Sequence, residues 1–137
     1  MIKYLNVRSR QRNEFIDITG EVERALEDCG IAEGVCYIYV PHTTAGVTIN
    51  EGADPAVARD IVNNLSRLVP HDLGYFHREG NADAHIKSSL TVWAFTCRSR
   101  PGNLPLAPGS PSIFASSTAP ATAGAWSRSY KADWAII

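Results

Sequence analysis

The chain has 137 residues and a formal net charge of −1, so its length fits one domain and its charge gives no general footprint for nucleic-acid binding. No apolar run approaches the roughly 18 residues of a membrane span, and the first residues lack the pattern of a signal peptide. We therefore expect a cytoplasmic protein that binds neither membranes nor nucleic acids, and three cysteines without a CxxC pair favour reduced thiols.

The first third of the chain predicts two short strands and a helix. Residues 2–7 and 14–18 have strand character, and we expect them to pair as a hairpin across a polar turn. Thr19 is expected to cap a helix that ends at Gly30. Cys29 is interpreted as a small buried side chain at the end of that helix.

The middle of the chain predicts a strand, a polar turn, a second strand and a long helix. The nearly continuous apolar run over 34–40 is typical of a central strand, and 47–50 is expected to form the strand after the turn. Asp54 and Pro55 predict the start of a helix that Pro70 ends. Its expected apolar stripe, which should face the core, consists of Val57, Ala58, Ile61, Leu65 and Leu68.

The composition changes after residue 90. Residues 1–90 hold 9 basic and 13 acidic side chains (net −4), whereas residues 91–137 hold 4 basic and 1 acidic (net +3), together with all three tryptophans. The proline- and glycine-rich run 101–111 and the small-residue run 116–125 favour a linker or a disordered tail over strands. The sequence therefore predicts a domain over 1–90 followed by a tail of different character.

A polar turn lies between the two central apolar runs. It carries His42, Thr43 and Thr44, and Glu51 follows the second strand. A neutral imidazole is the commonest metal ligand and the usual acid–base group near neutral pH. The two hydroxyls can donate to a substrate phosphate or satisfy the backbone of their own turn, and Glu51 can bind a metal or act as a base.

A second polar cluster begins at His77 and ends at Lys87. It contains His85, and Asn81 is expected to cap a short helix over 82–90. The N–H groups at the start of that helix can hold a phosphate, and an ordinary cap with solvated charges is the alternative. Three histidines with a nearby carboxylate suit a divalent metal site, although their spacing matches no recognised metal motif. We expect the two clusters to meet in one site.

Three linked motifs resemble the YjbQ family. They are Tyr39-Val-Pro-His-Thr-Thr-Ala-Gly-Val-Thr-Ile-Asn-Glu51, then Ala53-Asp-Pro55, then His77-x-x-Gly-Asn-Ala-Asp-Ala-His-Ile-Lys87, in the family's order and spacing. The resemblance covers about residues 1–90. It implies an α+β fold with β-sandwich-type sheets, two main helices and a short third, assembled as a homotrimer.

The resemblance also implies a secondary thiamine-phosphate synthase. Such an enzyme joins hydroxymethylpyrimidine diphosphate to a thiazole phosphate and releases diphosphate. The candidate residues are His42, Glu51 and His85 for catalysis, Thr43, Thr44, Asn50, Asn81 and Lys87 for substrate binding, and His42, His77 and His85 for a divalent Mg²⁺ or Zn²⁺ ion. The alternatives are a non-catalytic trimer that binds a metal or a phosphorylated small molecule, and a nonfunctional product of a frameshifted gene.

The last third of the chain departs from the family pattern. Family members continue with strands, a Gly-Thr-Trp-Gln segment and a Glu-Phe-Asp-Gly-Pro-Arg segment, and this chain has neither. Permissible codons for residues 91–124, read with a shift of two bases, yield both segments. We therefore hypothesise a frameshift near Leu90 or Thr91. Loss of the C-terminal strands would expose the edges of strands 35–40 and 47–50, which predicts marginal stability and impaired trimerisation.

Overall fold

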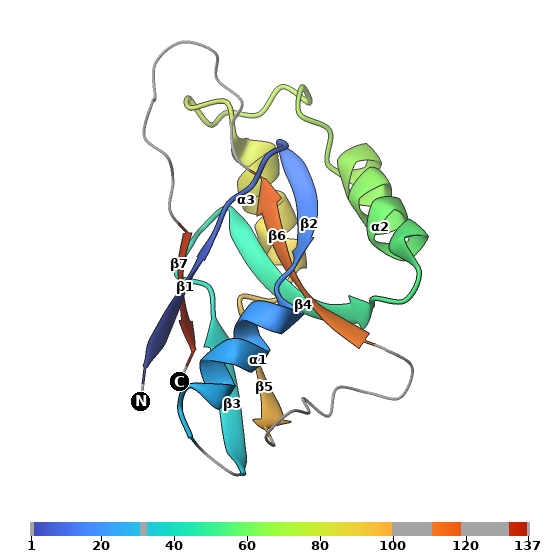
Figure 1. The fold of residues 1–137 in the computed structure, drawn as a ribbon. Helices are drawn as coiled ribbons and strands as arrows, with labels where there is room; N and C mark the ends of the chain where they lie inside the picture. The colour runs from blue at the N-terminus through green and yellow to red at the C-terminus, as the bar shows by residue number, and fades with distance from the viewer. Residues whose placement is uncertain (1, 31–32, 100–110, 119–131, 137) are drawn as a thin grey trace.

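The computed structural model describes residues 2–30, 33–99, 111–118 and 132–136, which form three helices and two antiparallel sheets (Figure 1). The fold is α+β, as the sequence predicted. In chain order the elements are β1 (Lys3–Val7), β2 (Asn13–Asp17), α1 (Thr19–Glu27), β3 (Gly34–Tyr39), β4 (Ala45–Glu51), α2 (Pro55–Leu68), α3 (Ala82–Leu90), β5 (Ala94–Ser99), β6 (Pro111–Thr118) and β7 (Ala132–Ile136). None of the described helices is long and apolar enough to cross a membrane.

The two sheets have the strand orders β1-β7-β3-β5 and β2-β6-β4. The strand β3 is central, as predicted, and pairs with β5 in a register that sets Cys36 opposite Cys97. The predicted hairpin of β1 and β2 is wrong, because β1 pairs with β7 and β2 pairs with β6. The turn between the first two strands carries the chain from one sheet to the other, and both strands find their partners in the C-terminal third (Figure 1).

The prediction of a linker or disordered tail is wrong for three C-terminal segments. Ala94–Ser99, Pro111–Thr118 and Ala132–Ile136 are strands, and β6 lies between two neighbours. Pairing with flanking strands outweighs weak local strand propensity, because β-propensity depends strongly on context. Residues 100–110 and 119–131 lie outside the described residues. The domain division near residue 90 and the frameshift stay predictions, because backbone pairing does not test the reading frame.

The core lies between the two sheets and α1. Its fully buried members include Ile18, Val22, Ile38 and Val47. Apolar side chains at these positions come from α1 and from the inward faces of β3 and β4, which alternate along each strand. These strands therefore hold the turn with His42 on a rigid support.

The helix α1 differs from the prediction at both ends. Ile18 is its N-cap, and the Thr19 hydroxyl instead accepts the Ile113 N–H at 2.9 Å and donates to Asp17 at 2.6 Å. Thr19 thus ties the helix to β6 rather than capping it. Cys29 is only partly buried, because it follows the last helical turn, where its thiol lies 3.1 Å from the Ala25 carbonyl oxygen.

The helix α2 begins where predicted but turns its apolar stripe outward. The Asp54 side chain accepts the Ala56 N–H at 2.8 Å, and Pro55 opens the helix. Ser66 contacts Asn13 at 3.5 Å, so the face that carries Ser66 lies against β2. Leu68 is 72% exposed and no residue of α2 is fully buried. The prediction that the stripe packs on the core is therefore wrong for Leu68.

Candidate functional site

The turn after β3 fixes the orientation of the His42 ring. The His42 N–H donates to the Val40 carbonyl at 2.8 Å. Its Nδ1 accepts the Thr44 backbone N–H at 3.1 Å and lies 3.0 Å from the Thr44 hydroxyl. A backbone N–H can only donate, so Nδ1 carries no proton and the neutral ring holds its proton on Nε2. His42 therefore presents an N–H donor at Nε2.

His42 and His85 come from the two separate sequence clusters. Burial lowers the pKa of His42 below its usual 6.5, and the neighbouring His85 charge lowers it further. The helix α3 is fastened to the turn, since the Ser88 hydroxyl donates to the Thr43 carbonyl at 2.5 Å. This contact brings α3 against the turn, and the sharing of one site by His42 and His85 stays a prediction.

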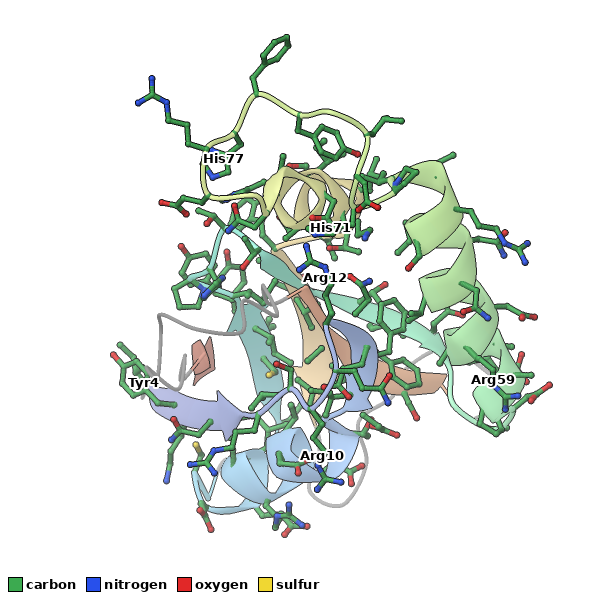
Figure 2. All side chains as sticks on the ribbon, turned by 90° about the horizontal axis from the view of Figure 1, so that it is seen from above. Tyr4, Arg10, Arg12, Arg59, His71 and His77 are labelled. Atoms are coloured by element: carbon green, nitrogen blue, oxygen red, sulfur yellow. The ribbon has the colours of Figure 1, made fainter. Side chains whose placement is uncertain are left out.

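His77 joins this pair from the loop before α3. Its ring lies edge-to-face with that of His85, with centroids 5.2 Å apart. Figure 2 shows His77 on the loop beside α3, and its Nε2 lies 3.7 Å from the Glu79 carboxylate. We call His42, His77 and His85 the imidazole cluster. Imidazole N–H groups donate hydrogen bonds, and a protonated imidazole adds a positive charge, so the cluster favours a negatively charged ligand with acceptor oxygens.

The start of α3 is built by Gly80 and Asn81. Gly80 has a φ of +70°, a conformation that residues with a Cβ rarely adopt, and it turns the chain into the helix. Asn81 is the N-cap residue as predicted, but its side chain makes no capping hydrogen bond. Asn81 is 7% exposed, and its buried Oδ1 has no hydrogen-bond partner. The positive end of the α3 dipole lies here, only a few residues from His77 and His85.

Lys87 lies in a buried ion-pair network rather than at the surface. Its Nζ donates to Asp83 Oδ2 at 2.9 Å and to Asn13 Oδ1 at 3.3 Å, and Lys87 is 4% exposed. Arg12 donates to Asp83 Oδ1 at 2.8 Å, and His71 lies 3.4 Å from the same oxygen. Lys87 is therefore placed to hold α3 against the chain before β2, and its predicted role in substrate binding stays a prediction.

Sequence reasoning missed Asp83 and Arg12. Desolvation raises the pKa of Asp83, but the hydrogen bonds and charges of Lys87 and Arg12 outweigh it, and the pKa falls below the usual 3.8. The pair of Asp83 and Lys87 at i and i+4 was the available signal, because such residues share one helix face. Arg12 gave no local signal, since it lies 71 positions from Asp83. Figure 2 shows Arg12 and His71 close together beside α3.

Asn50 and Glu51 lie away from the imidazole cluster. They end β4, whereas His42 and Thr44 precede its first residue. A strand of seven residues spans roughly 20 Å, so one subunit does not bring Glu51 to the imidazoles. Asn50 instead accepts the Glu51 N–H at 2.9 Å.

The predicted metal site does not fit the geometry of the cluster. Across the described parts of the chain, no three His, Cys, Asp or Glu side chains are grouped to hold a metal ion. A ligating imidazole needs a free lone pair on one nitrogen and normally donates from the other. His42 does the reverse, because its Nδ1 lone pair already accepts the Thr44 N–H. The metal therefore stays a prediction.

The segment after α3 closes tightly over the first residues of β4. The Val40 N–H donates to the Trp93 carbonyl, and the Val47 N–H to the Val92 carbonyl, each at 2.8 Å. A Cβ on Gly46 would lie 2.1 Å from the Thr91 hydroxyl and 3.0 Å from the Val92 carbonyl oxygen. Only glycine permits this approach, which holds the C-terminal end of α3 close to the turn of the site.

The comparisons with known proteins agree with these motifs. A family model described as UPF0047 protein YjbQ-like matches residues 3–108. The chain belongs to this family. It is 50% identical to a UPF0047 protein of Methanocaldococcus jannaschii over 90 residues, a match that spans 66% of this chain and 64% of that protein. It is 50% identical to UPF0047 protein YugU of Bacillus subtilis over 91 residues, 65% of this chain and 68% of that protein.

Solved structures of the family match nearly the whole chain. An uncharacterised YjbQ/UPF0047 protein from Clostridium acetobutylicum gives a TM-score of 0.81 at 33% identity and covers 98% of this chain and 96% of that one. The conserved hypothetical protein TT1486 from Thermus thermophilus gives 0.82 at 32% identity, with 98% of both chains covered. The fold likeness therefore extends beyond the roughly two thirds of the chain that these two curated relatives match in sequence.

Proposed function

We propose that the imidazole cluster binds the diphosphate group of a small molecule and stabilises it as a leaving group, as a thiamine-phosphate-synthase-type transferase requires. The observation that carries this proposal is that the turn with His42 lies against α3, where Ser88 donates to the Thr43 carbonyl and the rings of His77 and His85 are in contact. A bound polyphosphate relieves the repulsion between charged imidazoles, and each imidazole can donate an N–H to it. The N-terminus of α3 adds a favourable dipole next to the cluster.

The transfer needs little proton chemistry. The bond between the pyrimidine methylene carbon and the diphosphate oxygen breaks, and its electron pair leaves with diphosphate. The lone pair of the thiazole nitrogen forms the new C–N bond and yields the thiazolium ion. Negative charge therefore grows on the leaving oxygen, where the Nε2–H of His42 would stabilise it, with His85 as the second donor.

We also propose that the chain assembles as a homotrimer, so that a neighbouring subunit completes the site. Glu51 and Asn50 are a strand's length from the imidazoles of their own subunit, so they would reach a cluster only from a neighbouring subunit. In such an assembly Glu51 and Asn50 would contact the second substrate or orient a histidine. A cytoplasmic location fits the phosphorylated substrates proposed here.

The second candidate is a phosphate-binding protein without catalysis. It is favoured by the positions of Asn50 and Glu51, because one subunit brings neither of these predicted site residues to the imidazole cluster. Both candidates predict diphosphate binding, and only the first predicts product.

The test combines binding and turnover. Isothermal titration should show inorganic diphosphate binding to the full chain, and incubation with both thiamine precursors should yield thiamine phosphate. His42→Gln and His85→Ala should each lower kcat/KM at least about 100-fold, the usual loss when an imidazole that assists catalysis is removed. His71→Gln serves as the matched control, because His71 lies outside the imidazole cluster. Binding without product supports the second candidate, and absence of diphosphate binding contradicts both.

A further inference from the structure

The outward face of α2 forms a shallow apolar hollow. Its volume is ≈ 640 Å³, and its lining residues are Val57, Asp60, Ile61, Asn64, Leu65, Arg67 and Leu68. The opposite face of α2 packs on β2 and β4, so the hollow lies on the side away from the sheet. In Figure 1, α2 stands at the margin of the molecule with this side free of other described elements. An apolar helix stripe of this kind is normally covered by another surface.

The order of apolar and charged residues on this face is nearly the same in both directions along the helix. A two-fold axis across α2 at residue 63 would set Ile61 opposite Leu65 of the partner subunit and would bring Val57 within one residue of Leu68 of the partner subunit at the ends. The same axis would set Asp60 within one residue of Arg67 of the partner subunit. The charges would then be complementary at two symmetric places, which is the condition for an isologous contact.

We propose that α2 docks antiparallel against α2 of a second copy of this chain through this face. A partner surface that carries a single sign of charge would pair with either Asp60 or Arg67. An antiparallel copy of α2 would pair with both. The 14 residues of α2 span about 21 Å, so one helix pair is a small interface, and its association should depend on concentration. This contact is two-fold and is distinct from the proposed three-fold assembly. It turns a monomer into a dimer, and it turns a trimer into a hexamer when its two-fold axes lie perpendicular to the three-fold axis.

The test exchanges the charges of Asp60 and Arg67 and measures the mass of the assembly by sedimentation equilibrium. Wild-type protein should show a concentration-dependent doubling of mass. Asp60→Arg or Arg67→Asp alone sets like charges together at both symmetric places and should raise the dissociation constant of this step at least roughly tenfold. The double variant Asp60→Arg/Arg67→Asp should restore the wild-type constant. Arg59→Asp is the control, since Arg59 is exposed and points away from the molecule at the end of α2 (Figure 2).

Circular dichroism of each variant establishes that it is folded. A mass that does not double over the accessible concentrations would overturn the proposal. The proposal would also be overturned if the single variants doubled in mass like the wild type, or if the double variant did not restore the wild-type constant. In that case this face would bind a different protein.

Discussion

The buried carboxylate of Asp83 should be a large single contributor to stability. It is 0% exposed and accepts hydrogen bonds from Lys87 at 2.9 Å and Arg12 at 2.8 Å. Asp83→Asn keeps the shape of the side chain but removes its charge, which leaves Lys87, only 4% exposed, without a counter-ion. Removing one partner of a buried pair costs roughly 3–5 kcal/mol. That is a large part of the roughly 5–15 kcal/mol that stabilises a typical domain.

Urea unfolding at pH 7, followed by circular dichroism, measures this loss. With a urea m-value of about 2 kcal/mol/M, the midpoint should fall by roughly 1.5–2.5 M. Asp72→Asn is the matched control, because Asp72 is exposed, and it should change the free energy of unfolding by less than about 0.5 kcal/mol. The double variant Asp83→Leu/Lys87→Met should lose less than Asp83→Asn, since no buried ammonium is left behind.

The loss of stability in Asp83→Asn should also depend on pH. The folded-state pKa of Asp83 lies below 3.8, so its stabilisation is complete above pH 3.8 and is lost as the pH falls through the folded-state pKa. Wild type and Asp83→Asn should therefore converge in acid. If the two proteins unfold at the same urea concentration at pH 7, the ion-pair network does not hold α3 in place and our reasoning is refuted.

Three further predictions concern other parts of the fold. Gly46→Ala should lower the free energy of unfolding by roughly 1–3 kcal/mol, because its Cβ meets the Thr91 hydroxyl at 2.1 Å, and an unchanged urea midpoint would contradict this close approach. Thr19→Val should cost roughly 1–3 kcal/mol in the same assay, because the Ile113 N–H loses its acceptor, and a cost below about 0.5 kcal/mol would show that this bond is dispensable. His42 has a folded-state pKa below 6.5, so wild type should lose stability as the pH falls from 6.5 toward that value. His42→Gln should show a shallower pH dependence over the same window, and parallel curves for the two proteins would count against the burial of this ring.

Strong local signals made several elements predictable. The apolar run of β3 predicted a central strand, and Asp54 with Pro55 marked the start of α2 through a cap that the structure contains. In each case a short stretch of sequence carries the information, because caps, turns and apolar runs act over a few residues.

Other features depend on contacts between distant segments and gave no local signal. The partner of β1 is β7, more than 100 positions away, so the first two strands were wrongly paired with each other. The direction in which α2 faces is set by β2, which no periodicity within the helix reveals. Asp83 and Lys87 share one helix face, but Arg12, which completes the network, becomes their neighbour only in the folded chain, so the burial of this ion pair had no local signal.

The most direct test of the imidazole cluster is the pKa of His42, measured by NMR of its ring protons with and without inorganic diphosphate. The proposed site predicts a pKa below 6.5 in the free protein, because of burial and the neighbouring His85, and a rise on adding diphosphate as the bound anion favours the charged ring. A pKa at or above 6.5 in the free protein that does not move with diphosphate would contradict a shared anion site at His42 and His85.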